Sequence, residues 1–509
     1  MNHLKTLSAM ISKRLIEAAR KTTLVLSWPV QILLLICIAL VPTREHLQAA
    51  ERSVPAERPH IVIVLVDDLG YGDLSSFNAN SKIATPALDA FAGQSMRLTD
   101  AHAPGPLCHM SRYGLMTGQY PFRIDVNRWK EHALIGAEQT TIASLCREAG
   151  YRTAMVGKWH LGFEENGYDQ VLPGGPVDVG FDSFFGIRAS TDIPPYFYIR
   201  GDRAVEPPTE QIDANASPDW SPIQGEFWRA GGIAPNLDLH DVLPTFADEA
   251  TRIIDEHAGA QIAQPLMLYV ALPAPHTPWL PSELYLNSSR VPLYGDFVAM
   301  VDGVVGQILD RLQQHDMDDN ALVIFSSDNG PVWYDEDVQR TGHDSAGPWR
   351  GMKADAWEAG HRMPTIVRWP NRIEPGSTSD QLVCFTDFLA TFADLFGIGI
   401  ADDANVDSIS FLPTLLNRDN ALTPQRQQWV MRSGRGHYVV RDGDWKWIDR
   451  LGSGGFSKPN RIAATTGGPK SQLYDLSIDP GEQKNLADRM PEKVKAMQAI
   501  LIATIGETQ

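Results

Sequence analysis

His60-Ile-Val-Ile-Val-Leu-Val-Asp-Asp68 is the stretch of sequence that decides the fold of this chain. Its apolar residues run almost without interruption, which is typical of a strand buried on both faces of a parallel sheet. Thr85-Pro86 follows and predicts the cap and first turn of a helix that continues to Met96. A buried strand followed by a helix is the first unit of a layered α/β fold.

The same alternation of strand and helix continues along the chain. Helices are predicted at residues 140–150, 241–257 and 296–312, and strands at residues 152–156, 266–272 and 321–326. This spacing predicts the α/β class, with a large, mostly parallel sheet sandwiched by helices. Residues 164–237 are rich in Gly, Pro, Asp and aromatic residues, and we expect them to form loops over one face.

The character of the sequence changes near residue 425. Residues 438–448 predict two short strands about a turn at Asp442-Gly443, and residues 473–476 predict another strand. A terminal helix is expected from Pro491. The chain is therefore expected to have a large domain at residues 58–425 and a small C-terminal α+β subdomain at residues 426–509.

The first fifty residues have the layout of a secretory signal peptide. Basic residues at positions 13, 14, 20 and 21 precede an apolar run at residues 24–42, and Ala49-Ala50 supplies small residues after it. We expect an exported protein, periplasmic or secreted, with residues 1–50 removed. The alternative is an uncleaved N-terminal membrane anchor, because the apolar run approaches the ~20 residues that span a bilayer.

Charge and cysteine content exclude several classes of protein. The chain has 44 basic and 62 acidic residues, a net charge of −18, which argues against nucleic acid as a partner. Beyond residue 50 the cysteines are Cys108, Cys146 and Cys384, too few for a disulfide scaffold. Cys146 and Cys384 lie in apolar patterns and are expected to be buried, so Cys108 is the unusual one.

Two polar pairs follow predicted strands and suggest a metal site. Asp67-Asp68 ends the first strand, and Asp328-Asn329 follows the strand at residues 321–326. If both strands belong to one sheet, these side chains meet at its carboxyl edge, where ligands bind in such folds. An oxygen-only set suits Ca²⁺ or Mg²⁺. Taken singly, each pair also fits a helix cap or a turn.

Two further segments carry a resemblance to a known family. Cys108-His-Met-Ser-Arg112 resembles the Cys-x-Pro/Ala-x-Arg signature of type I sulfatases, with Met110 in place of proline or alanine. Residues 150–162, Gly-Tyr-Arg-Thr-Ala-Met-Val-Gly-Lys-Trp-His-Leu-Gly, resemble the second signature of that family. The resemblance extends from about Arg58 to the end of the chain.

The resemblance implies an alkaline-phosphatase-like fold, a sulfatase domain at residues 58–425, and a set of site residues. It implies that a maturation enzyme oxidises Cys108 to formylglycine, whose hydrate is the nucleophile. The implied metal site holds Ca²⁺, with Mg²⁺ as the alternative, and its ligands are Asp67, Asp68, Cys108, Asp328 and Asn329. The implied catalytic residues are Cys108, Arg112, Lys158, His160, His276 and Lys353.

The expected function is hydrolysis of a sulfate monoester, on a carbohydrate or an aryl alcohol. His276 would protonate the departing alcohol, and His160 would assist the release of sulfate. Arg112, Lys158, Lys353 and the metal would stabilise negative charge. Three alternatives remain open: a phosphomonoesterase or phosphodiesterase on the same scaffold, an unmodified inactive homologue that binds sulfated glycans, and a soluble α/β domain whose polar pairs are only caps.

Overall fold

The computed structural model describes residues 58–260, 262–400, 407–419 and 425–506. Residues 1–50, the predicted signal peptide or anchor, lie outside the described residues. Within the described ranges, no helix has both the length and the apolar character needed to cross a membrane.

The main sheet has ten strands among the described residues, in the order β13-β2-β12-β11-β1-β10-β4-β5-β6-β7. The five central strands β11, β1, β10, β4 and β5 are mutually parallel, while β12 and β6 pair antiparallel at the two flanks. The mostly parallel sheet is therefore confirmed. Its strands are β1 (His60–Asp67), β2 (Met96–Leu98), β4 (Arg152–Lys158), β5 (Ser183–Ile187), β6 (Tyr198–Arg200), β7 (Arg203–Ala204), β10 (Leu266–Pro275), β11 (Ala321–Ser327), β12 (Thr365–Arg368) and β13 (Thr378–Ser379).

The position of β1 explains its sequence. It pairs with β10 on one side and β11 on the other, and residues 61–66 are at most 2% exposed. A strand at the centre of a covered sheet has no solvent face, so both sets of alternating side chains are apolar. This is why the run lacks the alternation of an exposed strand.

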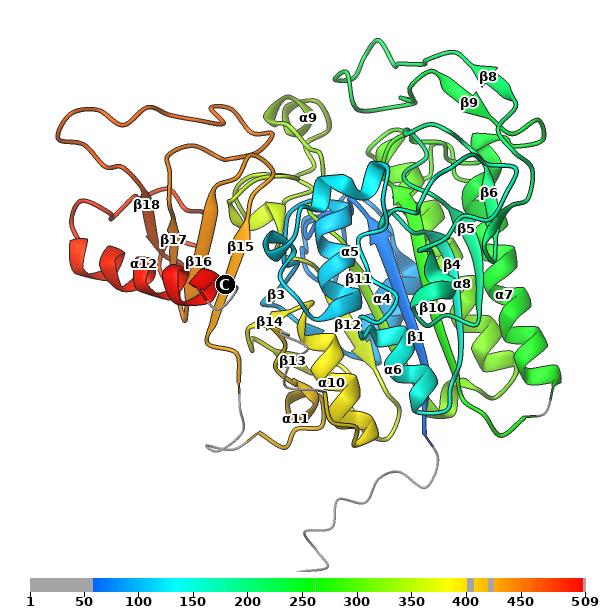
Figure 1. The fold of residues 1–509 in the computed structure, drawn as a ribbon. Coiled ribbons are helices and arrows are strands. Elements are labelled where there is room, and N and C mark those ends of the chain that lie inside the picture. Colours follow the sequence, from blue (N-terminus) through cyan, green and yellow to red (C-terminus); the bar gives the residue numbers. More distant parts are fainter. Residues whose placement is uncertain (1–57, 261, 401–406, 420–424, 507–509) are drawn as a thin grey trace, which may run out of the picture. The chain divides into compact units, whose positions relative to one another are not determined.

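Helices cover both faces of the sheet (Figure 1). One group consists of α4, α7 and α8, which pack on one another, and a second consists of α5, α6 and α10. The described helices of this part of the chain are α4 (Pro86–Gly93), α5 (Cys108–Thr117), α6 (Ile142–Glu148), α7 (Val242–Gly259), α8 (Tyr294–Gln314), α9 (Asp335–Thr341), α10 (Asp387–Phe396) and α11 (Leu412–Leu415).

The C-terminal part forms its own antiparallel sheet, as the sequence predicted. Its strands pair in the order β15 (Gln428–Arg432), β16 (Tyr438–Asp442), β17 (Trp445–Ile448) and β18 (Gln472–Asp475), and α12 (Pro491–Gly506) follows. Both sheets belong to one compact unit, Pro59–Gln509, and the domain boundary near residue 425 stays a prediction.

One expectation about the loops is wrong. Residues 164–237 are not loops throughout, because β5 extends the main sheet beside β4 and continues into β6 and β7. Short runs such as Ser183-Phe-Phe-Gly-Ile187 become strands by pairing with β4, and pairing across the chain leaves little trace in local composition. The remaining short strands are β3 (Ala101–His102) with β14 (Val383–Cys384), and β8 (Glu210–Ile212) with β9 (Gly231–Ile233).

Candidate active site

The carboxyl edge of the sheet brings the two polar pairs together. Val66 and Ser327 are partners in the β1–β11 register, so Asp67 and Asp328 leave the sheet at the same level. The Asp68 backbone N–H lies 3.4 Å from Asp328 Oδ1, and Asn329 Nδ2 donates to Asp68 Oδ1 at 2.6 Å. These four side chains are all buried.

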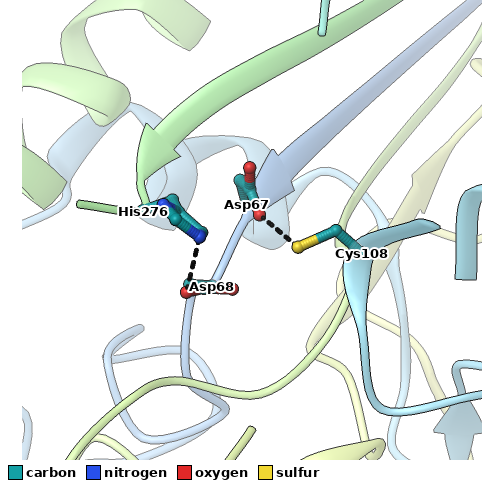
Figure 2. Close-up of side chains that lie close together, drawn as sticks. All are labelled: Asp67, Asp68, Cys108 and His276. Atoms are coloured by element: carbon teal, nitrogen blue, oxygen red, sulfur yellow. Dashed lines mark hydrogen bonds and ion pairs between the residues drawn. The ribbon is translucent and has the colours of Figure 1, made fainter. Parts of the chain in front are cut away.

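Cys108 is the first residue of α5 and points into this cluster. Leu107 before it is extended, so the chain enters the helix at the cysteine. Cys108 Sγ lies 3.2 Å from Asp67 Oδ1 and 3.3 Å from Lys353 Nζ. Figure 2 shows Asp67, Asp68, Cys108 and His276 turned toward one another. Ligand atoms of these four residues lie within 4.8 Å of one another, a grouping able to hold a metal ion.

Three cations lie against the three carboxylates. Arg112, one helical turn after Cys108, donates to Asp328 Oδ2 from Nε at 2.9 Å and ion-pairs with it through Nη2 at 2.7 Å. Lys158 Nζ contacts Asp67, and Lys353 Nζ lies 2.5 Å from Asp68 Oδ1. All six side chains are buried. Because an unpaired charge is unfavourable in a buried place, each of these groups stays ionised only with its oppositely charged partner beside it.

Burial and neighbouring charges shift the pKa values in this cluster. Burial by itself raises the pKa of Asp67, but Lys158, His276, Arg112 and Lys353 together lower it well below its usual range. Burial raises the pKa of the Cys108 thiol well above its usual value, and Asp328 and Asp67 add to the effect. An unmodified Cys108 is therefore a neutral thiol and a poor nucleophile.

His276 follows β10 directly, and the sheet positions its ring. Nδ1 lies 2.7 Å from the Thr277 carbonyl, which can only accept, so Nδ1 carries a proton. Nε2 lies 3.6 Å from Asp68 Oδ2 and faces the cluster. The imidazole is thus oriented with its Nε2 available for proton transfer at the site.

His160 lies two residues after Lys158, in a left-handed backbone conformation with φ of 60°. It is buried, and neither ring nitrogen has a hydrogen-bond partner among the described residues. Burial, followed by the nearby Lys158, lowers the pKa of His160 well below its usual value. It is therefore a neutral imidazole, with one N–H donor and one acceptor nitrogen that have no partner among the described residues.

Two polar residues that contact the site, Ser190 and Asp192, were not predicted. Lys158 Nζ donates to Ser190 Oγ at 2.6 Å. Asp192 ion-pairs with Arg229, and its Oδ1 lies 3.9 Å from His276 Nδ1. Ser190 and Asp192 belong to residues 164–237, which were expected to form loops over one face. That expectation was the only sequence feature pointing to these two residues. It carried no information about individual residues.

His109 is a second buried imidazole beside the cluster. Its ring centroid lies 5.6 Å from that of His160, and Nε2 has no hydrogen-bond partner among the described residues. Burial, with Lys158 and Lys353, lowers the pKa of His109 to about 3. Both histidines lie against Trp129, whose ring centroid is 4.3 Å from that of His160.

The chemistry of the cluster fits a hard divalent cation. Asp67, Asp68, Asp328 and Asn329 supply oxygen atoms in one buried place, and Asn329 Oδ1 is a buried acceptor without a hydrogen-bond partner among the described residues. Oxygen ligands are those that Ca²⁺ and Mg²⁺ prefer. The geometric grouping adds His276 to Asp67, Asp68 and Cys108, so the imidazole lies close enough to compete for, or adjoin, a bound ion.

A second polar cluster lies apart from these residues. His102 bonds to Asp100 at 2.7 Å and to His361 at 3.0 Å, and Lys446 pairs with Glu358 at 2.9 Å. This buried network joins β17 of the small sheet to the main part of the chain. Every charge in it has a partner, which indicates a structural role.

The sulfatase family model matches residues 59–398, and the chain belongs to the sulfatase family. It is therefore a sulfuric ester hydrolase, with the alkaline-phosphatase-like fold of that family.

The curated relatives include N-acetylgalactosamine-6-sulfatases and arylsulfatases. The chain is 31% identical to N-acetylgalactosamine-6-O-sulfatase of Bacteroides thetaiotaomicron over 484 residues, covering 88% of this chain and 93% of that protein. It is 28% identical to the human N-acetylgalactosamine-6-sulfatase over 466 residues, covering 87% and 84%. A solved structure from work on glycosaminoglycan metabolism by Bacteroides thetaiotaomicron matches with a TM-score of 0.77 and 30% identity, covering 89% of this chain and all of that one.

Proposed function

We propose that this protein hydrolyses a sulfate monoester of a carbohydrate, with formylglycine formed from Cys108 and a bound divalent metal, Ca²⁺ or Mg²⁺. The observation that carries the proposal is the position of Cys108 Sγ, 3.2 Å from Asp67 Oδ1 and 3.3 Å from Lys353 Nζ, inside a sulfatase site. The proposal of a carbohydrate substrate rests on the relatives that are N-acetylgalactosamine-6-sulfatases. This chain matches them over most of their length.

The metal would be held by Asp67, Asp68, Asp328 and Asn329, together with the modified side chain of residue 108. Bound there, it supplies positive charge that lowers the cost of bringing a sulfate oxygen to the site. The hydrated aldehyde supplies the attacking hydroxyl and a second hydroxyl, which a thiol lacks.

The positively charged side chains Lys353, Arg112 and Lys158 would position the reacting groups. Lys353 reaches both Asp68 and residue 108, so its ammonium lies where a sulfate oxygen next to the nucleophile would develop charge. Arg112 and Lys158 contact Asp328 and Asp67 from the other side and hold those carboxylates in place. These fixed charges need no reorganisation when negative charge builds up on the oxygens around sulfur.

His276 and His160 would move the protons. As the new O–S bond forms and the S–O bond to the alcohol breaks, the attacking hydroxyl would release its proton to solvent. His276, protonated on both ring nitrogens with Nδ1–H donating to the Thr277 carbonyl, would deliver its Nε2 proton to the departing oxygen. His160, neutral and without other hydrogen-bond partners among the described residues, would accept the proton from the second hydroxyl as sulfate is released. Water then restores the hydrate, so the net reaction consumes one water and yields alcohol and hydrogen sulfate.

The first test asks, on one preparation, whether residue 108 is a thiol or an aldehyde and whether the protein prefers a sulfate or a phosphate ester. Protein from its native host, or co-expressed with a formylglycine-generating enzyme, is digested with trypsin, and the mass of the peptide at residues 98–112 is measured. The same preparation is assayed on N-acetylgalactosamine 6-sulfate and its 6-phosphate analogue. We expect the aldehyde mass and preferential turnover of the sulfate. An intact thiol in active protein, or faster turnover of the phosphate, would overturn the proposal.

The metal has a test that does not depend on turnover. Chelator-treated protein should gain thermal stability on addition of Ca²⁺, and Asn329→Ala should lose most of that gain. Asn166→Ala, at an exposed position outside the cluster, is the matched control and should gain as much as the unsubstituted protein. Equal stabilisation of all three proteins by Ca²⁺ would contradict a metal at this site.

Export is also proposed, on the pattern of residues 1–50 alone, with the catalytic domain at residues 58–425. N-terminal sequencing of protein from the native host should find a start just beyond Ala50. A start at Met1 in membrane-associated protein would favour the anchor.

A further inference from the structure

A groove of about 540 Å³ lies beside the reaction centre, between the main part of the chain and the hairpin that joins β15 to β16. One wall is apolar and includes Leu107, Met110 and Phe122. The opposite wall is the hairpin turn, with Arg432 and Arg435. Its volume is in the range of ligand-binding pockets.

Hydrogen bonds tie both walls to residues next to the nucleophile. The Gly434 backbone N–H donates to the Ala354 carbonyl at 2.9 Å, and Ala354 follows Lys353. The Ala354 N–H in turn donates to the Pro106 carbonyl at 2.8 Å, two residues before Cys108. Leu107, on the apolar wall, adjoins Cys108 itself. The groove is therefore lined by segments that directly adjoin Cys108 and Lys353 along the chain.

The two arginines of the groove are exposed, and neither has an ion pair with a carboxylate among the described residues. Arg435 Nε donates to the Gly455 carbonyl at 3.0 Å, which holds the side chain in place and leaves its other N–H groups available. The guanidinium carbon of Arg432 lies 5.6 Å from the centre of the Tyr438 ring.

The groove is locally positive in an acidic protein. The one carboxylate among its lining residues is Asp125, whose Oδ1 accepts the backbone N–H of Asn127 at 3.1 Å. Two arginines against one aspartate leave a positive excess, whereas the chain as a whole carries −18. Two guanidinium groups without an ion pair to a carboxylate of the described residues are suited to a carboxylate or a sulfate group of a ligand.

We propose that this groove binds a negatively charged sugar residue next to the sulfated one, so that the substrate is an acidic oligosaccharide. Arg432 and Arg435 would bind its carboxylate or second sulfate, and Met110 and Phe122 would contact the apolar face of its ring. The proposal rests on the proposed sulfatase function and extends it to the substrate beyond the bond that is cleaved. Met110 would then bind substrate in the groove, and it lies in the same first turn of α5 as Cys108.

The test compares a chondroitin 6-sulfate hexasaccharide, its carboxyl-reduced form, and N-acetylgalactosamine 6-sulfate. The variants are Arg432→Gln, Arg435→Gln and the double variant. Arg450→Gln is the control, because Arg450 is 56% exposed and lies outside the groove. We expect the double variant to lose at least about 10-fold in kcat/KM on the hexasaccharide, mainly through KM, and less than about 2-fold on the monosaccharide.

A binding measurement separates this proposal from the proposed function. Calorimetric titration of the hexasaccharide is made in the Cys108→Ala background, so the ligand is not consumed. Loss of binding in the double arginine variant supports the groove even if no sulfate is released, in which case only the hydrolase proposal fails. Equal affinity with and without the arginines overturns the groove, as does an equal loss of activity on the hexasaccharide and the monosaccharide. If the carboxyl-reduced ligand, which keeps its sulfates, binds as well as the acidic one and needs the arginines to do so, the group that they bind is the second sulfate and not the carboxylate.

Discussion

The Lys353 ammonium lies 3.3 Å from the Cys108 sulfur, although 245 positions separate the two residues. Lys353 also pairs with Asp68 at 2.5 Å, so one buried cation connects the nucleophile position to the carboxylates of the proposed metal site. Burial by itself lowers the pKa of Lys353, but Asp68, Cys108, Asp67 and Asp328 raise it well above its usual value. The neighbouring carboxylates therefore favour the charged form of the lysine.

Lys353→Met should lower kcat/KM by about 10²–10³-fold, because it removes a fixed positive charge beside the nucleophile. It should also lower the melting temperature, since Asp68 loses a buried ion pair. Steady-state kinetics and thermal unfolding check the two effects. Lys495→Met, at a 69% exposed position on α12, is the control and should leave both unchanged. Full activity of Lys353→Met would remove Lys353 from the mechanism.

His276→Gln should show an activity loss that depends on the leaving group. An alcohol on a sugar needs a proton as it departs, so the variant should lose about 10²–10⁴-fold in kcat/KM on a sugar sulfate. 4-Nitrophenyl sulfate releases a stable phenolate and should lose less than about 10-fold. Similar losses on both substrates would indicate that His276 has another role, such as holding Asp68.

Lys446→Met should destabilise the protein by about 3–5 kcal/mol, because Glu358 and Glu482 would remain buried without their shared cation. Lys446 Nζ lies 2.9 Å from a carboxylate oxygen of each. Denaturant unfolding measures the effect. Replacing Lys446 and Glu358 together, by Met and Gln, should recover part of the loss. No recovery in the double variant would show that the two charges do not interact.

The Asp302 carboxyl group, which is not among the site residues, is expected to make the stability of the protein depend on pH. Its carboxylate accepts the Leu88 N–H at 2.8 Å and the Ala87 N–H at 3.1 Å, at the start of α4. Burial raises the pKa of Asp302 from 3.8 to about 6, although these two hydrogen bonds oppose the shift. A raised pKa in the folded state means that the group's contribution to stability is present below pH ~4 and is lost as pH rises through about 6.

Asp302→Asn removes this titration. The free energy of unfolding of the variant relative to the unsubstituted protein should therefore rise by about 2 kcal/mol between pH 4.5 and pH 8. Chemical denaturation at several pH values provides the measurement, with Asp310→Asn, at an exposed position of the same helix, as the control. A pH-independent difference would show that Asp302 is ionised throughout.

The sequence predicted those helices, strands and turns whose formation depends mainly on their own residues. The unbroken apolar run of β1, Pro86 in the first turn of α4, and the turn at Asp442-Gly443 depend on neighbouring residues, and they lie where expected. The Thr85 side chain makes no capping hydrogen bond, and α4 ends at Gly93 because the chain reaches β2 at Met96, where the helix was expected to end. Cys146 and Cys384 are buried free thiols, as their apolar surroundings indicated. In contrast, β5 and its continuation were taken for loops, because a strand that exists through pairing with β4 has no strong pattern of its own.

The sequence by itself determined where Cys108, Arg112, Lys158 and the two Asp-containing pairs stand relative to strand ends and a helix start, because these offsets are local. Only the tertiary structure decided what each one touches. Lys353 reaches Cys108, Ser190 bonds to Lys158, and Arg432 and Arg435 stand across a groove from Met110. These contacts join segments that are far apart along the chain, and they arise when the sheet order and the docking of the small subdomain bring those segments together. Short-range patterns record the conformation of a segment, whereas the partner of a side chain depends on the whole packed chain.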